Sequence, residues 1–189
     1  RVFITEDDFV RTDPVDKTRE VDPLTLYYPI KHLDRCHIVS NGDQTDTIYD
    51  TLEQGGSFEI ALRTRTYEPD GPIFTPRISG MVDLNGPGYQ LAVLKPACPE
   101  TDVCVRQFFE YEKPIAGVGH CITTYEDDGD PPPRFAGEPF RVVLQDGLDE
   151  IAGFYWNLLN AENRVAMLVK LIDRETNGAK LKIVNQYGT

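Results

Sequence analysis

The sequence predicts a fold of the α+β class, and three patterns indicate it. Apolar and polar residues alternate in several segments between positions 77 and 125, which is typical of a run of antiparallel strands. Apolar residues recur at helical spacing over Leu148–Asn160, which predicts an amphipathic helix. Two alternating segments, 164–173 and 179–185, flank Asn177-Gly178, a strong hairpin signal. We therefore expect one or two antiparallel sheets with a few packed helices.

The first third of the chain combines short strands, a loop and two helices. Val2–Ile4 and His37–Val39 are strand-like, and Leu24–Ile30 is rich in β-branched and aromatic residues, which predicts a further strand. Residues 6–23 are acidic and contain prolines, which is typical of a surface loop. Thr45–Gln54 is predicted to be a helix that ends at a Gly-Gly pair, and Ser57 is predicted to cap a second helix. That second helix spans 58–65, and the later predicted strands span 78–84, 89–95, 103–111, 120–125 and 140–144.

Length, charge and cysteine content exclude several classes of protein. We expect one domain over 1–189. The net charge of −12 argues against nucleic acid as a partner. No apolar run approaches the roughly 18 residues that cross a bilayer, so no membrane partner is expected. The cysteines form no Cys-x-x-Cys pair and the histidines show no zinc spacing. We therefore expect no metal, reduced thiols and a cytoplasmic location.

The stretch SNGDQTD, residues 40–46, joins a predicted strand to a predicted helix. Asn41 and Gly42 can adopt positive φ there and turn backbone N–H groups toward one point. The N-terminus of the following helix is itself a site that favours anions. The alternative is that Thr45 or Asp46 caps its own helix and that the loop binds nothing else. Spacing alone leaves both interpretations open.

Two further clusters carry candidate chemistry. Arg63, Arg65 and Arg77 stand out in so acidic a chain, because arginine grips phosphate through paired hydrogen bonds. They can equally pair with neighbouring carboxylates, although Arg77 is held at the start of a predicted strand. Glu110-Tyr111-Glu112, at the end of another predicted strand, offers groups for acid–base chemistry or forms a solvated strand end.

Taken together, these residues resemble the archaeal-type inosine monophosphate (IMP) cyclohydrolase family. The resemblance rests on three motifs in the same order and spacing, with a fourth pair after a later strand. They are Ser40-Asn41-Gly42 followed by Thr45–Ile48, then Tyr67-Glu68 with Asp70, then Thr75–Ile78, and finally Tyr111-Glu112. The similarity is strongest over 36–83 and weaker after 115.

The resemblance implies a fold similar to that of N-terminal nucleophile hydrolases, a four-layer αββα sandwich of two antiparallel sheets. It implies the last step of purine synthesis, in which 5-formamidoimidazole-4-carboxamide ribonucleotide (FAICAR) closes to IMP with loss of water. The partner is then a small purine nucleotide, no cofactor is required, and a homo-oligomer is expected.

The resemblance also implies which residues form the site. Acid–base chemistry is expected of three residues and an orienting role of a fourth, and several polar residues are expected to hold the substrate. The catalytic candidates are Tyr67, Glu68, Tyr111 and Asp46, and the substrate-binding candidates are Arg1, Asn41, Gly42, Thr45, Thr75 and Arg77. Of these, Arg77 is expected to anchor the phosphate or to polarise an oxygen.

Two other functions are compatible with the same motifs. One is a purine-nucleotide-binding domain without catalysis, and the other is an amidohydrolase-like enzyme on the same fold. Self-processing amide hydrolysis is disfavoured, because position 1 is Arg1 and not Cys, Ser or Thr. The chain begins inside a predicted strand, and family members carry residues before this point. We therefore expect that residues preceding Arg1, and part of the site with them, are missing from the chain.

Overall fold

The computed structural model describes residues 1–6, 9–18, 20–99 and 101–187. Within these residues the framework is one seven-stranded antiparallel sheet whose strands follow chain order, β1 to β7. Each strand pairs with its neighbours in sequence, and the connections are short except for residues 14–29 between β2 and β3 and residues 41–76 between β4 and β5. The strands are β1 Val2–Glu6, β2 Phe9–Asp13, β3 Ile30–Leu33, β4 Cys36–Ser40, β5 Arg77–Asp83, β6 Tyr89–Pro96 and β7 Cys104–Tyr111.

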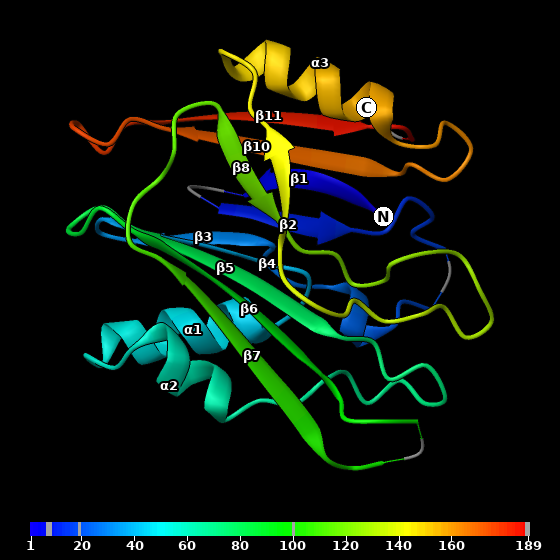
Figure 1. Ribbon diagram of the computed structural model, residues 1–189. Coiled ribbons are helices and arrows are strands. Elements are labelled where there is room, and N and C mark those ends of the chain that lie inside the picture. The colour runs from blue at the N-terminus through cyan, green and yellow to red at the C-terminus, as the bar shows by residue number, and fades with distance from the viewer. Residues whose placement is uncertain (7–8, 19, 100, 188–189) are drawn as a thin grey trace.

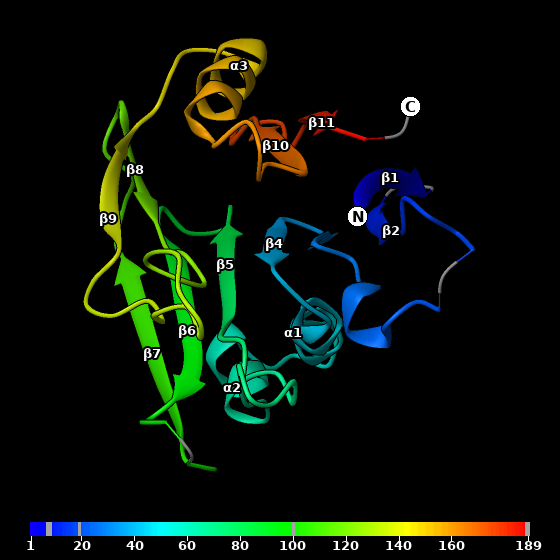
Figure 2. The same cartoon turned by 90° about the vertical axis from the view of Figure 1, so that its right-hand side faces the viewer.

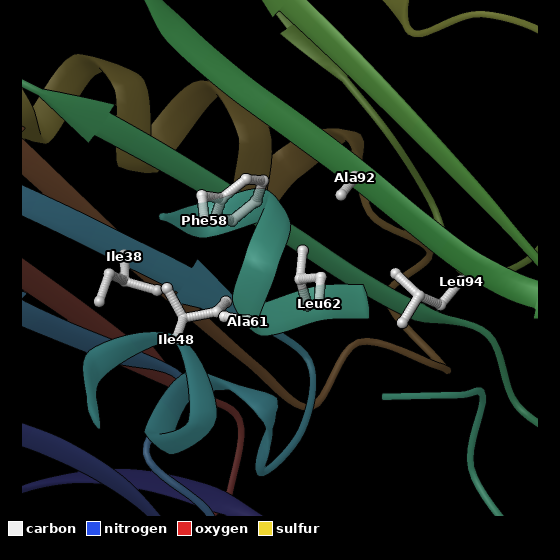
Figure 3. Close-up of a cluster of buried hydrophobic side chains, with 7 residues drawn as sticks. All are labelled: Ile38, Ile48, Phe58, Ala61, Leu62, Ala92 and Leu94. Carbon is white, nitrogen blue, oxygen red and sulfur yellow. The ribbon is translucent and has the colours of Figure 1, made fainter. Parts of the chain in front are cut away.

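Two helices, α1 Gln44–Glu53 and α2 Phe58–Arg63, cover one face of this sheet (Figure 1). The Ser57 hydroxyl accepts a hydrogen bond from the Ile60 amide and so begins α2. A buried apolar cluster fills the space between these helices and the sheet (Figure 3), and its members are Ile38, Ile48, Phe58, Ala61, Leu62, Ala92 and Leu94. Burial of these side chains holds α1 against the sheet, and with it the loop that precedes α1.

The opposite face of the sheet carries a second, discontinuous layer. A hairpin of β10 Ala166–Ile172 and β11 Ala179–Asn185 lies over that face, and helix α3 Leu148–Leu158 covers the hairpin (Figure 1). A separate two-stranded sheet of β8 Val118–Cys121 and β9 Phe140–Val143 stands to one side of it (Figure 2). The hairpin turn contains Asn177 at φ 61°, which Asn tolerates better than most residues.

Most of the elements expected from periodicity are confirmed. The predicted α+β class, the C-terminal hairpin, the amphipathic helix α3 and the strands β4 to β7 are all present, with ends that differ by a few residues. The helix predicted over 58–65 ends at Arg63, because the Thr64 hydroxyl bonds back to the Ala61 carbonyl and the chain then leaves the helix.

Three expectations about individual segments are wrong. Residues 6–23 are not all loop, because Phe9–Asp13 forms β2 and buries Val10 and Thr12. The strand predicted over Leu24–Ile30 is replaced by a 3₁₀ turn, Pro23–Thr25, since Asp22 accepts from the Leu24 amide and Pro23 occupies the first helical position. The strand predicted over 120–125 lies at Val118–Cys121, and the residues after it form a loop.

The four-layer sandwich of two antiparallel sheets is not confirmed. Helices, sheet, strands and helix do follow one another in that order (Figure 1). However, the second strand layer consists of two separate two-stranded sheets among the described residues. In the described residues no ladder of hydrogen bonds joins these two small sheets to each other.

Candidate active site

A cavity of about 470 Å³ opens where five segments meet at one end of the main sheet. The segments are the start of the chain, the 3₁₀ turn, the loop after β4, the loop before β5 and the loop after β8. The cavity is lined by Arg1, Asp22, Leu24, Thr25, Tyr27, Asn41, Glu68, Asp70, Thr75, Thr124 and Tyr125. A volume of this size is typical of sites for small molecules.

A buried arginine underlies the loop beside this cavity. The side chain of Arg77 is 4% exposed, and its Nη1 atom lies 2.6 Å from Asp43 Oδ1, 2.7 Å from Gln44 Oε1 and 3.6 Å from Glu68 Oε1. A charge this deeply buried needs partners of this kind, because desolvation is costly. Arg77 therefore ties the loop after β4 to the loop before β5, and it is not among the residues that line the cavity.

Gly42 is the point where the backbone passes closest to this arginine. A Cβ atom at position 42 would lie 2.6 Å from Gln44 Oε1, 2.7 Å from Arg77 Nη1 and 2.9 Å from Glu68 Oε1. Distances below about 3.0 Å are too short for a real Cβ atom. A side chain at position 42 would therefore have to displace these side-chain ends from their contacts with one another, and glycine lets the loop lie directly on the Arg77 guanidinium.

The amide of Asn41 has every hydrogen-bonding position occupied by protein groups. Its Oδ1 atom accepts from the Ile78 amide at 2.9 Å and from Gln44 Nε2 at 3.0 Å. Its Nδ2 atom donates to the Pro76 carbonyl at 2.9 Å and to Thr124 Oγ1 at 3.3 Å. A primary amide offers two donors and one oxygen with two lone pairs, so Asn41 is saturated. It positions the cavity wall and keeps no free group for a ligand.

A chain of hydrogen bonds with a fixed direction crosses the cavity wall. Asp70 accepts from the Thr75 amide at 2.7 Å and from the Thr75 hydroxyl in a short contact. The Thr75 hydroxyl has one proton, which it gives to the carboxylate, so at 2.9 Å it accepts from the Tyr125 hydroxyl. Tyr125 thus donates into the protein, and the lone pairs of its oxygen remain as acceptors for a ligand.

The two carboxylates nearest to Arg77 have opposite electrostatic environments. Burial raises the pKa of Glu68 above its usual value, although the charge of Arg77 acts in the opposite direction. Burial also acts to raise the pKa of Asp43, but hydrogen bonds from Arg65 and Arg77 and the charges of both outweigh it, so the pKa of Asp43 is lowered. Two carboxylates held at different pKa values are typical of sites that transfer protons.

The family model described as IMP cyclohydrolase-like protein matches residues 1–177. The chain belongs to this family. No curated protein matches the chain closely enough to name a relative. In the described residues, no helix is long and apolar enough to cross a membrane. Nor do the described residues include a group of three or more His, Cys, Asp or Glu side chains that could hold a metal ion.

The structure brings together four of the ten site residues that the resemblance to IMP cyclohydrolases picks out. Arg1, Asn41, Glu68 and Thr75 line the same cavity, although they lie far apart in the chain. Gly42 and Arg77 lie directly beneath it. Thr45 is fully buried behind the loop, where its hydroxyl contacts Ser40 Oγ and donates to the Gly42 carbonyl at 3.1 Å.

Three residues that the resemblance suggests as catalytic in an IMP cyclohydrolase lie away from this cavity. Asp46 pairs with Lys31 at 2.6 Å on the side of α1 that faces β3. The Tyr67 hydroxyl donates to the Thr101 carbonyl at 2.7 Å. The Tyr111 ring stacks on both Tyr89 and His120, with ring centroids 4.6 and 4.1 Å away, and those two rings also contact each other. Their assigned roles stay predictions, and none of them lines the cavity.

Several residues that line the cavity belong to no motif by which the sequence could have identified them. Thr124 and Tyr125 belong to a loop whose sequence, beside a Pro- and Asp-rich stretch, shows no motif. Tyr27 lies in the segment that the sequence predicts to be a strand. Burial raises the pKa of its phenol, which stays neutral. Asp43 and Gln44, which contact Arg77, lie inside the SNGDQTD stretch but are not among the site residues that the resemblance picks out.

Proposed function

We propose that the protein is an IMP cyclohydrolase that closes FAICAR to IMP and releases water. One observation carries this proposal. Residues from three of the four motifs that resemble the family, spread from Asn41 to Thr75, line a single cavity together with Arg1 and the 124–125 loop. The family match over residues 1–177 supports the same reaction.

The reaction places three demands on this cavity. The carboxamide nitrogen attacks the formyl carbon, one nitrogen–carbon bond forms, and the formyl oxygen becomes a hydroxyl group. That oxygen then leaves as water with one proton from the carboxamide and one from the formamido nitrogen. An amide nitrogen is a poor nucleophile, so the site must orient it, accept its proton and stabilise the developing charge on oxygen.

Glu68 is the best-placed proton acceptor. It lines the cavity, and burial raises the pKa of its carboxyl toward the range in which a carboxylate both accepts and returns a proton near neutral pH. Arg77 lies 3.6 Å from its Oε1 atom and restricts where the carboxylate can turn. We assign Glu68 as the group that takes the carboxamide proton and delivers a proton to the leaving oxygen.

Two loop hydroxyls and one arginine complete the assignment. Thr124 Oγ1 accepts from Asn41, so its proton is free to donate to the formyl oxygen. The Tyr125 oxygen accepts from a ligand N–H or hydroxyl. Arg1 is the one basic residue among the described residues that line the cavity, so we assign it to the phosphate.

Turnover of FAICAR by the purified protein tests this function, with IMP formation followed by absorbance and confirmed by chromatography. We expect Glu68→Gln to reduce kcat by about 10²–10⁴-fold, the usual contribution of a general base. The matched control is Glu59→Gln, since Glu59 lies on the outer face of α2 and pairs with exposed Arg63. IMP binding without turnover by the wild-type protein would instead establish a nucleotide-binding domain, and neither binding nor turnover would refute the proposal.

A further inference from the structure

A second cavity, of about 270 Å³, lies between β10 and the sheet face opposite α1 and α2. Its walls are mainly apolar side chains of β3 to β6 and β10. Two basic side chains also line it, Lys170 from β10 and His37 from β4, and no carboxylate is among the described residues that do so. An apolar cavity with a few convergent polar groups is the usual form of a small-molecule site.

Lys170 is a cation without a counter-ion. It stands between Leu168 and Ile172, which line the same cavity, so its side chain is directed between the layers. No ion pair or hydrogen bond joins it to another residue in the part of the chain that the structure describes, and burial lowers its pKa. Lys170 is partly buried, and a cation held beside apolar walls without a described counter-ion is open to pair with an anionic ligand.

His37 presents a bare hydrogen-bond acceptor. The Asn177 amide donates from Nδ2 to the Asp34 carbonyl at 2.9 Å, so its Oδ1 atom accepts from His37 Nε2, also at 2.9 Å. The proton of the neutral ring is therefore on Nε2, and Nδ1 carries a lone pair. His37 is 6% exposed, and its Nδ1 atom is buried without a partner. A ligand donor at this point would satisfy it.

An apolar slot, formed by Val39, Gly80 and Leu91, leads away from Lys170 and His37. A neighbouring cavity of about 470 Å³, distinct from the candidate active site, shares Val39, Gly80 and Leu91 with the 270 Å³ cavity. The two cavities therefore adjoin along the sheet face. Val39 is 48% exposed although it lies on the central strand β4. A Cβ atom at Gly80 would lie 3.1 Å from Leu91 and 3.2 Å from Val39, so the glycine keeps the slot deep.

We propose that this slot binds a hydroxycarboxylate with an apolar chain. The carboxylate pairs with the Lys170 ammonium, the adjacent hydroxyl donates to His37 Nδ1, and the chain lies over Val39, Gly80 and Leu91 toward the neighbouring cavity. Charge complementarity selects an anion, the bare imidazole nitrogen selects a donor beside it, and the apolar walls select a hydrocarbon chain. The proposal does not depend on the cyclohydrolase reaction.

Calorimetric titration of the full chain with 3-hydroxydecanoate, decanoate and 1-decanol tests this inference. We expect saturable binding of 3-hydroxydecanoate, roughly 2- to 10-fold weaker binding of decanoate, and at least about tenfold weaker binding of the alcohol. Equal affinity for all three compounds, or no saturable binding of the first, would overturn the proposal.

Three variants locate the ligand. Lys170→Met is expected to weaken 3-hydroxydecanoate binding at least about tenfold, and it should fold well because it replaces a partly buried cation by an apolar side chain of similar length. Lys180→Met is the matched control, because Lys180 is exposed on the same hairpin. Val39→Trp fills the slot from an exposed position and should abolish binding. Unchanged affinity in Lys170→Met, with the fold verified by thermal unfolding, would contradict the assignment.

Discussion

Arg77 Nη1 lies 2.7 Å from Gln44 Oε1, and this contact sets the direction of the hydrogen bonds that run from Gln44 through Asn41 to Thr124 in the wall of the candidate active site. Arginine can only donate, so the Gln44 oxygen accepts and its Nε2 atom donates to Asn41. Asn41 in turn donates to Thr124 from its Nδ2 atom. A buried group that does not line the cavity thereby leaves the Thr124 hydroxyl proton free as a donor toward the cavity.

Arg77→Met is expected to lower the free energy of unfolding by about 3 kcal/mol, because it leaves Glu68 and Gln44 buried without their partner. Arg63→Met is the control, since Arg63 is 64% exposed and pairs with Glu59 one turn away. That change should cost no more than about 0.5 kcal/mol. Denaturant unfolding measures both, and equal losses would show that Arg77 does not organise the site.

Gly42→Ala is expected to destabilise the protein by about 1–3 kcal/mol and to reduce turnover, because the new methyl group overlaps three polar side chains. Gly153→Ala is the matched control. Gly153 lies within α3, and a Cβ atom there meets nothing within 4 Å. The free energy of unfolding of this control variant should exceed that of wild type by about 0.5–1 kcal/mol, because alanine has the higher helix propensity. Thermal unfolding measures the stability of both variants. Wild-type stability in Gly42→Ala would show that close approach does not favour glycine at position 42.

Tyr125→Phe is expected to lower kcat/KM by roughly 2- to 10-fold, the value of one hydrogen bond to the substrate. The Thr75 hydroxyl keeps its bond to Asp70 in this variant, so thermal stability should change little. Tyr187→Phe serves as the control, since Tyr187 is 50% exposed. Unaltered kinetics in Tyr125→Phe would exclude the 124–125 loop from substrate binding.

Glu68 and Asp43 should have opposite effects on the pH dependence of stability. Because the pKa of Glu68 is raised on folding, its stabilising contribution is complete below its ordinary value of 4.5 and is lost as pH rises through the folded pKa. Glu68→Gln should therefore gain stability relative to wild type as pH rises above the ordinary value of 4.5 and through the folded pKa of Glu68.

The pKa of Asp43 is lowered on folding, so its contribution is present above the ordinary value of 3.8 and is lost as pH falls. Asp43→Asn should therefore be less stable than wild type at neutral pH and approach it in acid. Unfolding curves at a series of pH values measure both differences, and slopes of the same sign would contradict the electrostatic account.

Tyr111→Phe is expected to keep turnover within about twofold of wild type, because Tyr111 lies in an aromatic stack with Tyr89 and His120 outside the cavity. The same outcome is expected for Asp46→Asn, whose carboxylate pairs with Lys31. Steady-state kinetics measures these variants, and a loss of a hundredfold or more in either would place that residue in the reaction after all.

The sequence by itself determined the elements whose signals are local. Side-chain periodicity predicts the strands β4 to β7, the helix α3 and the Asn177-Gly178 hairpin, because burial of one face requires that periodicity. It failed at Leu24–Ile30, where a capping Asp and a Pro outweigh β propensity. The strand-to-helix loop predicted between Ser40 and Asp46 is confirmed, but neither Asn41 nor Gly42 adopts the positive φ that the sequence suggested there.

The tertiary structure alone decided which side chains meet. Five segments converge on the cavity, and contacts between residues distant in sequence leave no periodic trace in any one of them. Arg77 looks like a phosphate ligand in the sequence, yet folding buries it under Gly42 with three polar partners. Thr124 and Tyr125 enter the site from a loop without a motif. Hydrogen-bond direction depends on the whole network, so only the assembled fold determines which groups remain free for a ligand.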